Sequence, residues 1–154
     1  MSDIALLWSN ELGGCDIALA GGDLVMDDGL NTANLISVFT DARAREGDDL
    51  PDGADPRGWW GDVLGAPSEQ IGSRLWLLAR SKQTVLTVER ARNFTTEAVA
   101  WFLTDQICSA VNVQAERQPG DILAIGITHD RPTGPARQQY DYIWNATGAS
   151  LNGL

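Results

Sequence analysis

The amino-acid sequence predicts a protein with both helices and strands, of class α/β in the broad sense and α+β in the narrow one. We expect a single domain in which a small mixed or antiparallel sheet packs against helices. Two observations lead to this prediction. Within residues 94–130, apolar residues first recur at helical spacing and then alternate with polar ones, as in half-buried strands. Pro119 and Gly120 divide the alternating stretch, which is typical of a hairpin turn. The length of 154 residues fits one domain.

Residues 94–130 are expected to form one helix followed by one β-hairpin. Thr95 is the predicted N-cap, and Glu97 follows in the first turn, where a negative charge interacts favourably with the helix dipole. The buried stripe of the helix is predicted to contain Val99, Phe102, Leu103, Ile107, Ala110 and Val111. The buried faces of the two strands are predicted to carry Val111, Val113 and Ala115, then Leu123, Ile125 and Ile127.

The N-terminal part of the chain is predicted to hold an arm and a second hairpin. Residues 1–15 are expected to be a loosely structured arm, with Trp8 as its anchor. A hairpin is expected within residues 16–26, because Gly21-Gly22 can adopt the positive φ angles of a tight turn. We find no internal repeat in the sequence.

Two further helices are expected between this hairpin and residue 94. The first spans residues 32–44, begins at Asn31 or Thr32, and buries Leu35, Val38, Phe39 and Ala42. An acidic loop follows up to Pro56, and residues 68–92 are expected to be helical in two pieces that break near Ser81.

The last part of the chain is predicted to form a linker, an aromatic strand and a tail. Residues 132–135 form the linker, after which Tyr140, Tyr142 and Trp144 alternate with other residues as in a strand. Two interpretations stay open: the strand pairs with the sheet of its own chain, or it joins the sheet edge of another chain. In the second case, removal of residues 136–154 should leave a folded domain. The predicted organisation is therefore an arm (1–15), a core (16–131) and a C-terminal segment (132–154).

The composition excludes several classes of partner. The formal net charge of −10 disfavours binding to nucleic acid and to anionic membrane surfaces, both of which attract basic proteins. No apolar run is long enough to cross a bilayer. The two cysteines, Cys15 and Cys108, are interpreted as independent thiols in a reducing compartment rather than as a disulfide.

The sequence offers no convincing catalytic or metal site, and we predict no cofactor and no small-molecule substrate. His129 is the only histidine and has no predicted partner for general base catalysis or metal binding. The acidic stretch of residues 48–55 does not match the ligand spacing of a calcium loop. The carboxylates that could serve in glycoside hydrolysis show no paired spacing: Glu11, Asp16, Glu69 and Glu97. No serine or cysteine has a recognisable histidine partner.

The adjacent tryptophans Trp59 and Trp60 are the best candidates for a binding role. The flanking glycines indicate close backbone approach or unusual turns, so the indoles could be buried or could be anchors of an interface. Arg57 and Asp62 could orient the pair through an ion pair. The predicted interface residues are Trp59, Trp60, Arg57, Asp62, Tyr140, Tyr142 and Trp144.

Three sequence blocks resemble a known family when they are taken in order. They are Leu-Ile-Ser-Val-Phe-Thr-Asp-Ala-Arg-Ala at 35–44, Arg-Gly-Trp-Trp-Gly-Asp at 57–62 and Gly-Ser-Arg-Leu-Trp-Leu-Leu at 72–78. With the helix and hairpin that follow, they resemble the phage protein Gp46 family, baseplate wedge proteins of Mu-like contractile-tailed phages. That family is related to the small wedge and sheath-initiator protein of T-even phages. The resemblance covers about residues 16–145.

The resemblance implies a structural subunit of a contractile-tail baseplate, located in the virion tail and assembled in the cytoplasm of the bacterial host. It implies contacts with other wedge proteins and with tail sheath or tube proteins. It also implies a part in templating the sheath, in which related proteins exchange strands between subunits. The alternative function is a peptidoglycan-cleaving, lysozyme-like tail hydrolase, which the missing carboxylate pair disfavours.

Overall fold

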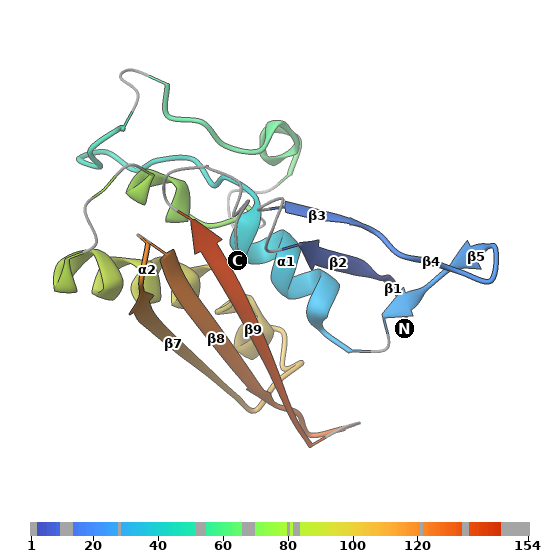
Figure 1. Cartoon of the computed structure of the whole chain (residues 1–154). Coiled ribbons are helices and arrows are strands. Elements are labelled where there is room, and N and C mark those ends of the chain that lie inside the picture. Colours follow the sequence, from blue (N-terminus) through green and yellow to red (C-terminus); the bar gives the residue numbers. More distant parts are fainter. Residues whose placement is uncertain are drawn as a thin grey trace.

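The computed structural model describes residues 3–9, 14–27, 29–51, 55–65, 70–79, 81, 84–120, 122–133 and 136–145. The protein is a single domain of mixed helices and small antiparallel sheets, as predicted (Figure 1). Its N-terminal strands are β1 (Asp3–Ile4), β2 (Leu6–Ser9), β3 (Gly14–Ile17), β4 (Leu19–Ala20), β5 (Asp23–Leu24) and β6 (Met26–Asp27). The helices are α1 (Asn31–Phe39), α2 (Val85–Ala98) and α3 (Trp101–Thr104), with 3-10 turns η1 (Trp60–Val63) and η3 (Leu75–Leu78). The C-terminal strands are β7 (Ala110–Gln118), β8 (Ile122–Asp130) and β9 (Arg137–Asn145).

The largest sheet is built from the three C-terminal strands in the order β7-β8-β9, all antiparallel. The predicted hairpin is confirmed, because β7 and β8 pair along their whole length and Gly120 in the turn has a φ of 85°. Strand β9 pairs with β8 in the same way, so the aromatic strand lies in the sheet of its own chain.

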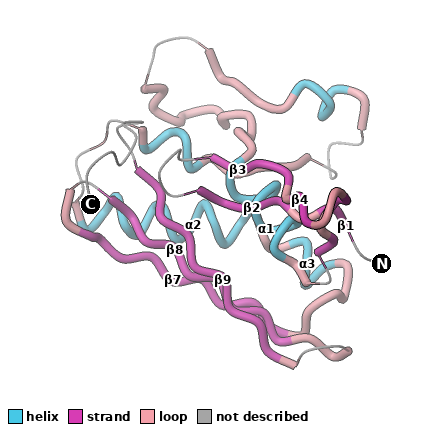
Figure 2. Tube along the Cα trace, turned by 45° about the vertical axis from the view of Figure 1, so that its right-hand side comes forward, coloured by secondary structure: helices cyan, strands magenta, loops and turns pink. Residues whose placement is uncertain are grey.

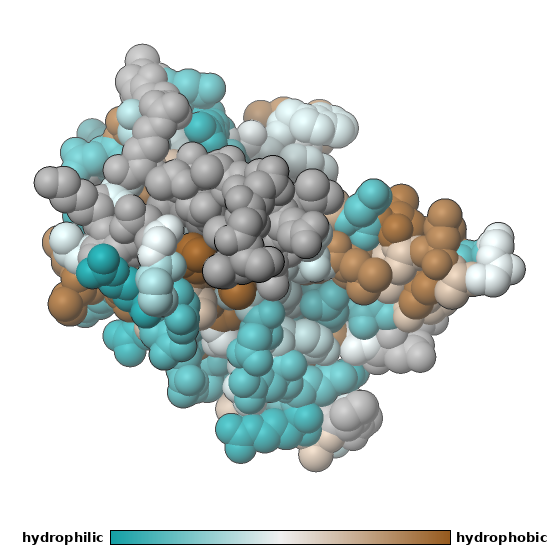
Figure 3. Space-filling view, in the orientation of Figure 1, coloured by the Kyte–Doolittle hydropathy of each residue, from teal (hydrophilic) through white to brown (hydrophobic). Residues whose placement is uncertain are grey.

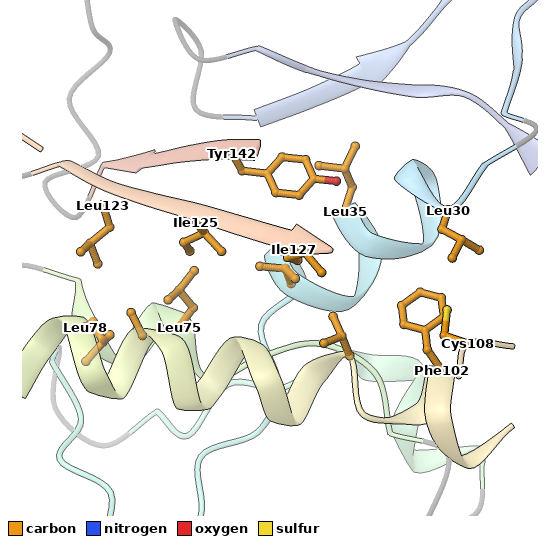
Figure 4. Close-up of a cluster of buried hydrophobic side chains, with 13 residues drawn as sticks. Leu30, Leu35, Leu75, Leu78, Phe102, Cys108, Leu123, Ile125, Ile127 and Tyr142 are labelled. Carbon is orange, nitrogen blue, oxygen red and sulfur yellow. The ribbon is translucent and has the colours of Figure 1, made fainter. Parts of the chain in front are cut away.

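The core lies between one face of this sheet and the helices (Figures 1 and 2). On β8, Leu123, Ile125 and Ile127 are at most 1% exposed, which confirms the predicted buried face. Tyr142 of β9 lies opposite Ile125 and is also buried. Figure 4 shows these side chains facing Leu35 of α1, Leu75 and Leu78 of η3 and Phe102 of α3, together with Leu30, which precedes α1, and Cys108, which precedes β7.

The N-cap of helix α2 lies eleven residues before Thr95, so the prediction of Thr95 as an N-cap is wrong. Thr84 is the N-cap, and its hydroxyl accepts a hydrogen bond from the Thr87 amide at 3.2 Å. Thr95 and Glu97 lie in the last turn of α2, and Thr95 is fully buried. The predicted continuation of this helix is also wrong, because α2 ends at Ala98, α3 is a single short turn, and Ala110 and Val111 lie in β7. Leu103, predicted to be buried, is 44% exposed.

Helix α1 also differs from the prediction at both of its ends. It ends at Phe39, because the backbone of Thr40 is extended and the Thr40 carbonyl accepts a hydrogen bond from the Ser73 amide at 2.9 Å. At the start, neither Asn31 nor Thr32 caps the helix with its side chain. The Asp27 carboxylate accepts from the Thr32 amide at 2.7 Å, which places a negative charge at the helix N-terminus.

The segment between α1 and α2 is less helical than predicted. Of the predicted helix at 68–92, the described residues before Val85 contain only the 3-10 turn η3 and extended chain. Gly72, with a φ of 101°, lies against the backbone of Thr40, where an added Cβ would come within 2.5 Å of the carbonyl oxygen. This close crossing, rather than helix, fixes residues 70–74 beside the end of α1.

The N-terminal region is more ordered than the predicted loose arm. Strands β1 and β2 pair with β6 and β3, and Trp8 stacks on Phe39 of α1 with 4.1 Å between ring centroids. The predicted hairpin at 16–26 is confirmed only around Gly21-Gly22, where both glycines have positive φ between the paired strands β4 and β5. Its outer parts pair elsewhere, Ile17 with Leu6 of β2 and Met26 with Ile4 of β1. The expectation of no internal repeat is wrong: residues 3–6, 16–19 and 23–26 follow one pattern and hold equivalent places among these strands.

Candidate interaction surface

The strongest candidate site is the tryptophan loop, which comprises residues 57–64. Gly58 has a φ of 113° and lies against Arg43 in the segment that follows α1. Trp59 precedes η1, and its indole folds over Gly61 so closely that an added Cβ would lie 2.2 Å from the ring. The ring centroids of Trp59 and Trp60 are 5.5 Å apart, and the ring planes make an angle of 45°. Both glycines are therefore required by the local geometry, as the sequence indicated.

Two charged residues of the loop, Arg57 and Asp62, attach it to the rest of the protein through separate contacts. Arg57 pairs with Asp41 at 2.9 Å and lies over the Trp76 ring at 4.5 Å. The Asp62 carboxylate accepts a hydrogen bond from the Ile71 amide at 3.2 Å. The suggested orienting ion pair is therefore replaced by these two contacts, each of which ties one end of the loop to a different segment.

This attachment leaves the apolar side chains of the loop in solvent. Trp59 is 40% exposed and Trp60 is 73% exposed, and Val63 and Leu64 beside them are at least 80% exposed. Sequence reasoning missed Val63 and Leu64, because a Val-Leu pair in a loop carries no pattern that separates exposed from buried. Four apolar side chains exposed on one short, fixed loop are a typical sign of a protein-binding surface.

Beneath the loop, Arg74 joins the acidic segment after α1 to helix α2. Its guanidinium binds Asp48 at 3.0 Å and Glu97 at 2.8 Å and lies over the Phe94 ring at 4.5 Å. Burial raises the pKa of Asp48, but hydrogen bonds from the Arg45 amide and from Arg74 outweigh this effect and lower it. Glu97 thus acts as a bridge between segments instead of as the dipole partner predicted for it.

The residues considered for catalysis do not form a catalytic arrangement in the described structure. Asp16 lies on β3 and accepts from the Ile17 amide at 2.7 Å, whereas Glu97 of α2 is held by Arg45 and Arg74. Glu11 and Glu69 lie outside the described residues. In the calcium-like stretch, Asp48 is paired with Arg74, and residues 52–54 are not described. No group of three or more metal-binding side chains occurs among the described residues.

One expectation about nucleophiles needs correction, because Cys108 does have a histidine neighbour. Its Sγ lies 3.5 Å from Nδ1 of His129, whose Nε2 is 2.9 Å from Oδ1 of Asn34. Burial raises the pKa of the Cys108 thiol, and burial together with Arg131 lowers the pKa of His129 to about 4. Both groups are therefore neutral at pH 7, so the pair stabilises the core and does not generate a thiolate. Cys15 is an exposed free thiol.

The aromatic residues of β9 pack within their own chain. The Tyr142 hydroxyl donates to Oδ1 of Asn31 at 2.9 Å, and that of Tyr140 accepts from the Leu30 amide at 2.8 Å. Trp144 lies opposite Leu123 and packs on the core. Their proposed interface role, like that of the tryptophan loop, stays a prediction. Among the described residues, no helix has the length and apolar character needed to span a membrane.

Comparison with known proteins defines the class to which this fold and surface belong. The family model of phage protein GP46 matches residues 30–136, so the chain belongs to that family and the resemblance is confirmed. Among its relatives, the chain is 47% identical over 135 residues to "Baseplate protein gp46" of Escherichia phage Mu, a match that covers 87% of this chain and 90% of the relative. It is 36% identical over 139 residues to "Mu-like prophage FluMu protein gp46" of Haemophilus influenzae, which covers 90% of this chain and 94% of that relative.

Proposed function

We propose that this protein is a structural subunit of the baseplate of a contractile phage tail. The name of the phage Mu relative supports this role, since the two chains are similar over nearly their whole length. The observation that carries the proposal is the tryptophan loop. An exposed cluster of two tryptophans, a valine and a leucine, fixed by contacts at both ends of the loop, is suited to binding another protein.

The partners we propose are other baseplate wedge proteins and the tail sheath or tube proteins, and the location is the virion tail. Strand β9 supports a role in sheath assembly, because it is an edge of the three-stranded sheet in the described structure. Its aromatic side chains hold it against the core, which keeps its outer edge extended and in register. Such an edge can pair with a strand from a neighbouring subunit.

Co-expression with the products of the adjacent tail genes tests the proposal. We expect a stable complex in size-exclusion chromatography, and we expect Trp60→Ala to weaken it at least tenfold, because a large exposed indole would be buried at the interface. Leu86→Ala is the matched control, since Leu86 is also exposed but lies on α2, away from the loop. If no complex forms with any tail protein, or if both variants behave as the wild type, the proposal is wrong.

A further inference from the structure

The repeated tetrapeptides of the N-terminal region build a three-way strand junction. Each tetrapeptide has an aspartate, an apolar residue, a compact central residue and a second apolar residue. The three central residues are Ala5, Ala18 and Val25. Their backbones form a closed ring of hydrogen bonds: Ala5 N–H to Val25 at 2.8 Å, Val25 N–H to Ala18 at 2.9 Å, and Ala18 N–H to Ala5 at 3.2 Å.

The apolar residues on either side of each central residue pair across the three ribbons that leave the ring. The pairs are Ile4 with Met26, Leu6 with Ile17, and Leu19 with Leu24. Successive residues of a strand point to opposite faces, and directly paired residues share a face. The six flanking side chains therefore lie on the face opposite to that of the central residues.

This face is unusually apolar for a surface in water. Apart from the half-buried Leu6, its members are 40% to 73% exposed, whereas Ala5 and Ala18 are 7% exposed. We call this face, made of Ile4, Leu6, Ile17, Leu19, Leu24 and Met26, the junction surface. Figure 3 shows apolar residues gathered on the part of the molecule that projects around β3, β4 and β5. Two-stranded ribbons with only two to four residues per strand add little stability by themselves, so their exposed aliphatic side chains are better explained by binding.

An acidic rim accompanies the junction surface. Asp3, Asp16 and Asp23 are exposed, one at the start of each tetrapeptide. Each carboxylate accepts a hydrogen bond from the amide of the next residue, at 3.2, 2.7 and 2.8 Å respectively. These bonds occupy N–H groups that an added strand would use, so the ribbons are poorly suited to strand pairing there. What remains available is the side-chain face.

We propose that the junction surface docks into an apolar depression bordered by lysine or arginine on a different protein. The three rim carboxylates favour a basic border, and their repulsion disfavours a second copy of this chain, whose net charge is −10. The same charge disfavours an anionic membrane. The inference goes beyond the proposed function, because it concerns a second surface. It rests on that function in one respect, namely that the partner is sought among tail proteins.

Site-specific cross-linking tests this docking in the full chain. A benzophenone amino acid is placed at position 19, 60 or 85, and the chain is co-expressed with all products of the tail gene cluster. Val85 is the control position, because it is 87% exposed but lies on α2. We expect position 19 to cross-link to one different protein, at a peptide with apolar residues beside lysine or arginine, and position 85 to give no product.

Two results would overturn the inference but leave the proposed function intact. In the first, position 19 cross-links only to another copy of this chain; in the second, position 19 gives no cross-link although position 60 does. No product from either position would overturn both.

Substitutions separate the apolar contribution from the charged one. With the cross-linked protein as probe, Leu19→Ser with Leu24→Ser should weaken binding at least tenfold, and Asp16→Asn with Asp23→Asn about threefold with a shallower salt dependence. Asparagine keeps an oxygen that can accept the neighbouring amide, so the fold should persist. Val85→Ser with Leu86→Ser is the matched control and should bind as the wild type does. Equal losses in all three variants would refute a specific docking surface.

Discussion

The C-terminal sheet and the N-terminal junction are both built from antiparallel strands, yet they treat apolar side chains in opposite ways. On β8, Leu123, Ile125 and Ile127 are at most 1% exposed and lie under the helices. On β4, Leu19 is 73% exposed, and its cross-strand partner Leu24 is 41% exposed. The two regions differ in what packs on them. Helices cover one face of the long sheet, whereas the short ribbons project from the rest of the protein. The first region thus forms the core, and we propose that the second, together with the tryptophan loop, is a surface for binding.

The largest effect should come from removing β9. Deletion of residues 136–154 takes away Tyr142 from the core and a whole strand from the sheet, so we expect loss of the cooperative thermal transition. The full chain is the control and should melt cooperatively. Retention of a cooperative transition after the deletion would show that β9 is dispensable, and it would favour the interpretation in which this strand serves another chain.

A single core truncation should have the next largest effect. Ile127→Ala should lower the free energy of unfolding by about 2–5 kcal/mol, because it leaves a cavity in a fully buried region. Ile36→Ala is the matched control: Ile36 is 40% exposed on α1, and the loss there should stay below about 1 kcal/mol. Urea denaturation measures both. Similar losses at the two positions would contradict the proposed division between the regions.

Protonation of His129 gives a pH-dependent test of the core. The pKa of His129 is about 4 in the folded chain and 6.5 in the reference state, so between these values the unfolded chain binds more protons. The contribution of His129 to stability should therefore be fully present above about pH 7 and fall by about 3 kcal/mol as the pH drops through this window. The lowered pKa of Asp48 makes its own contribution at lower pH, because that contribution is lost only as the carboxylate is protonated.

Denaturation curves of the wild type and of His129→Gln between pH 7 and pH 5 isolate the histidine. The variant should be less stable at pH 7 but should depend less on pH. Parallel curves for the two proteins would show that His129 is protonated at the same pH in the folded and unfolded chains.

The smallest effect on stability is expected at the exposed surfaces. Leu19→Ser and Val63→Ser should change the free energy of unfolding by no more than about 0.5 kcal/mol, since both side chains are largely in solvent. Their melting temperatures should match that of the wild type. A marked loss at either position would mean that the side chain supports the fold of the isolated chain.

The part of the fold that was predictable from sequence is the part determined by local patterns. Alternation and the Pro-Gly turn predicted β7 and β8. Gly21-Gly22 likewise marked its hairpin. The tetrapeptide repeat was present in the sequence, with identical residues at 3–6 and 16–19, but four residues are too short a repeat to indicate a structural unit, so its role became evident only from the strand pairing.

The features that sequence reasoning missed depend on contacts between separate elements, most of them far apart in the chain. Asp27 caps α1 across a turn, and Arg57 binds Asp41 from 16 residues away. His129 meets Asn34 across 95 residues. None of these pairings has a periodic signal, because each is created by packing between elements. For the same reason, the tryptophan loop could be recognised as unusual, but its exposure could not be deduced.

Hydrogen–deuterium exchange on the free chain and on its complex with tail proteins tests most directly whether this molecule is a stable core that presents binding surfaces. In the free chain, the amides of β8 should exchange most slowly, whereas those of residues 17–24 and 57–64 should exchange quickly. On complex formation, these two segments should gain the most protection. Protection gained only within β7 and β8, with no change at residues 17–24 and 57–64, would contradict the account.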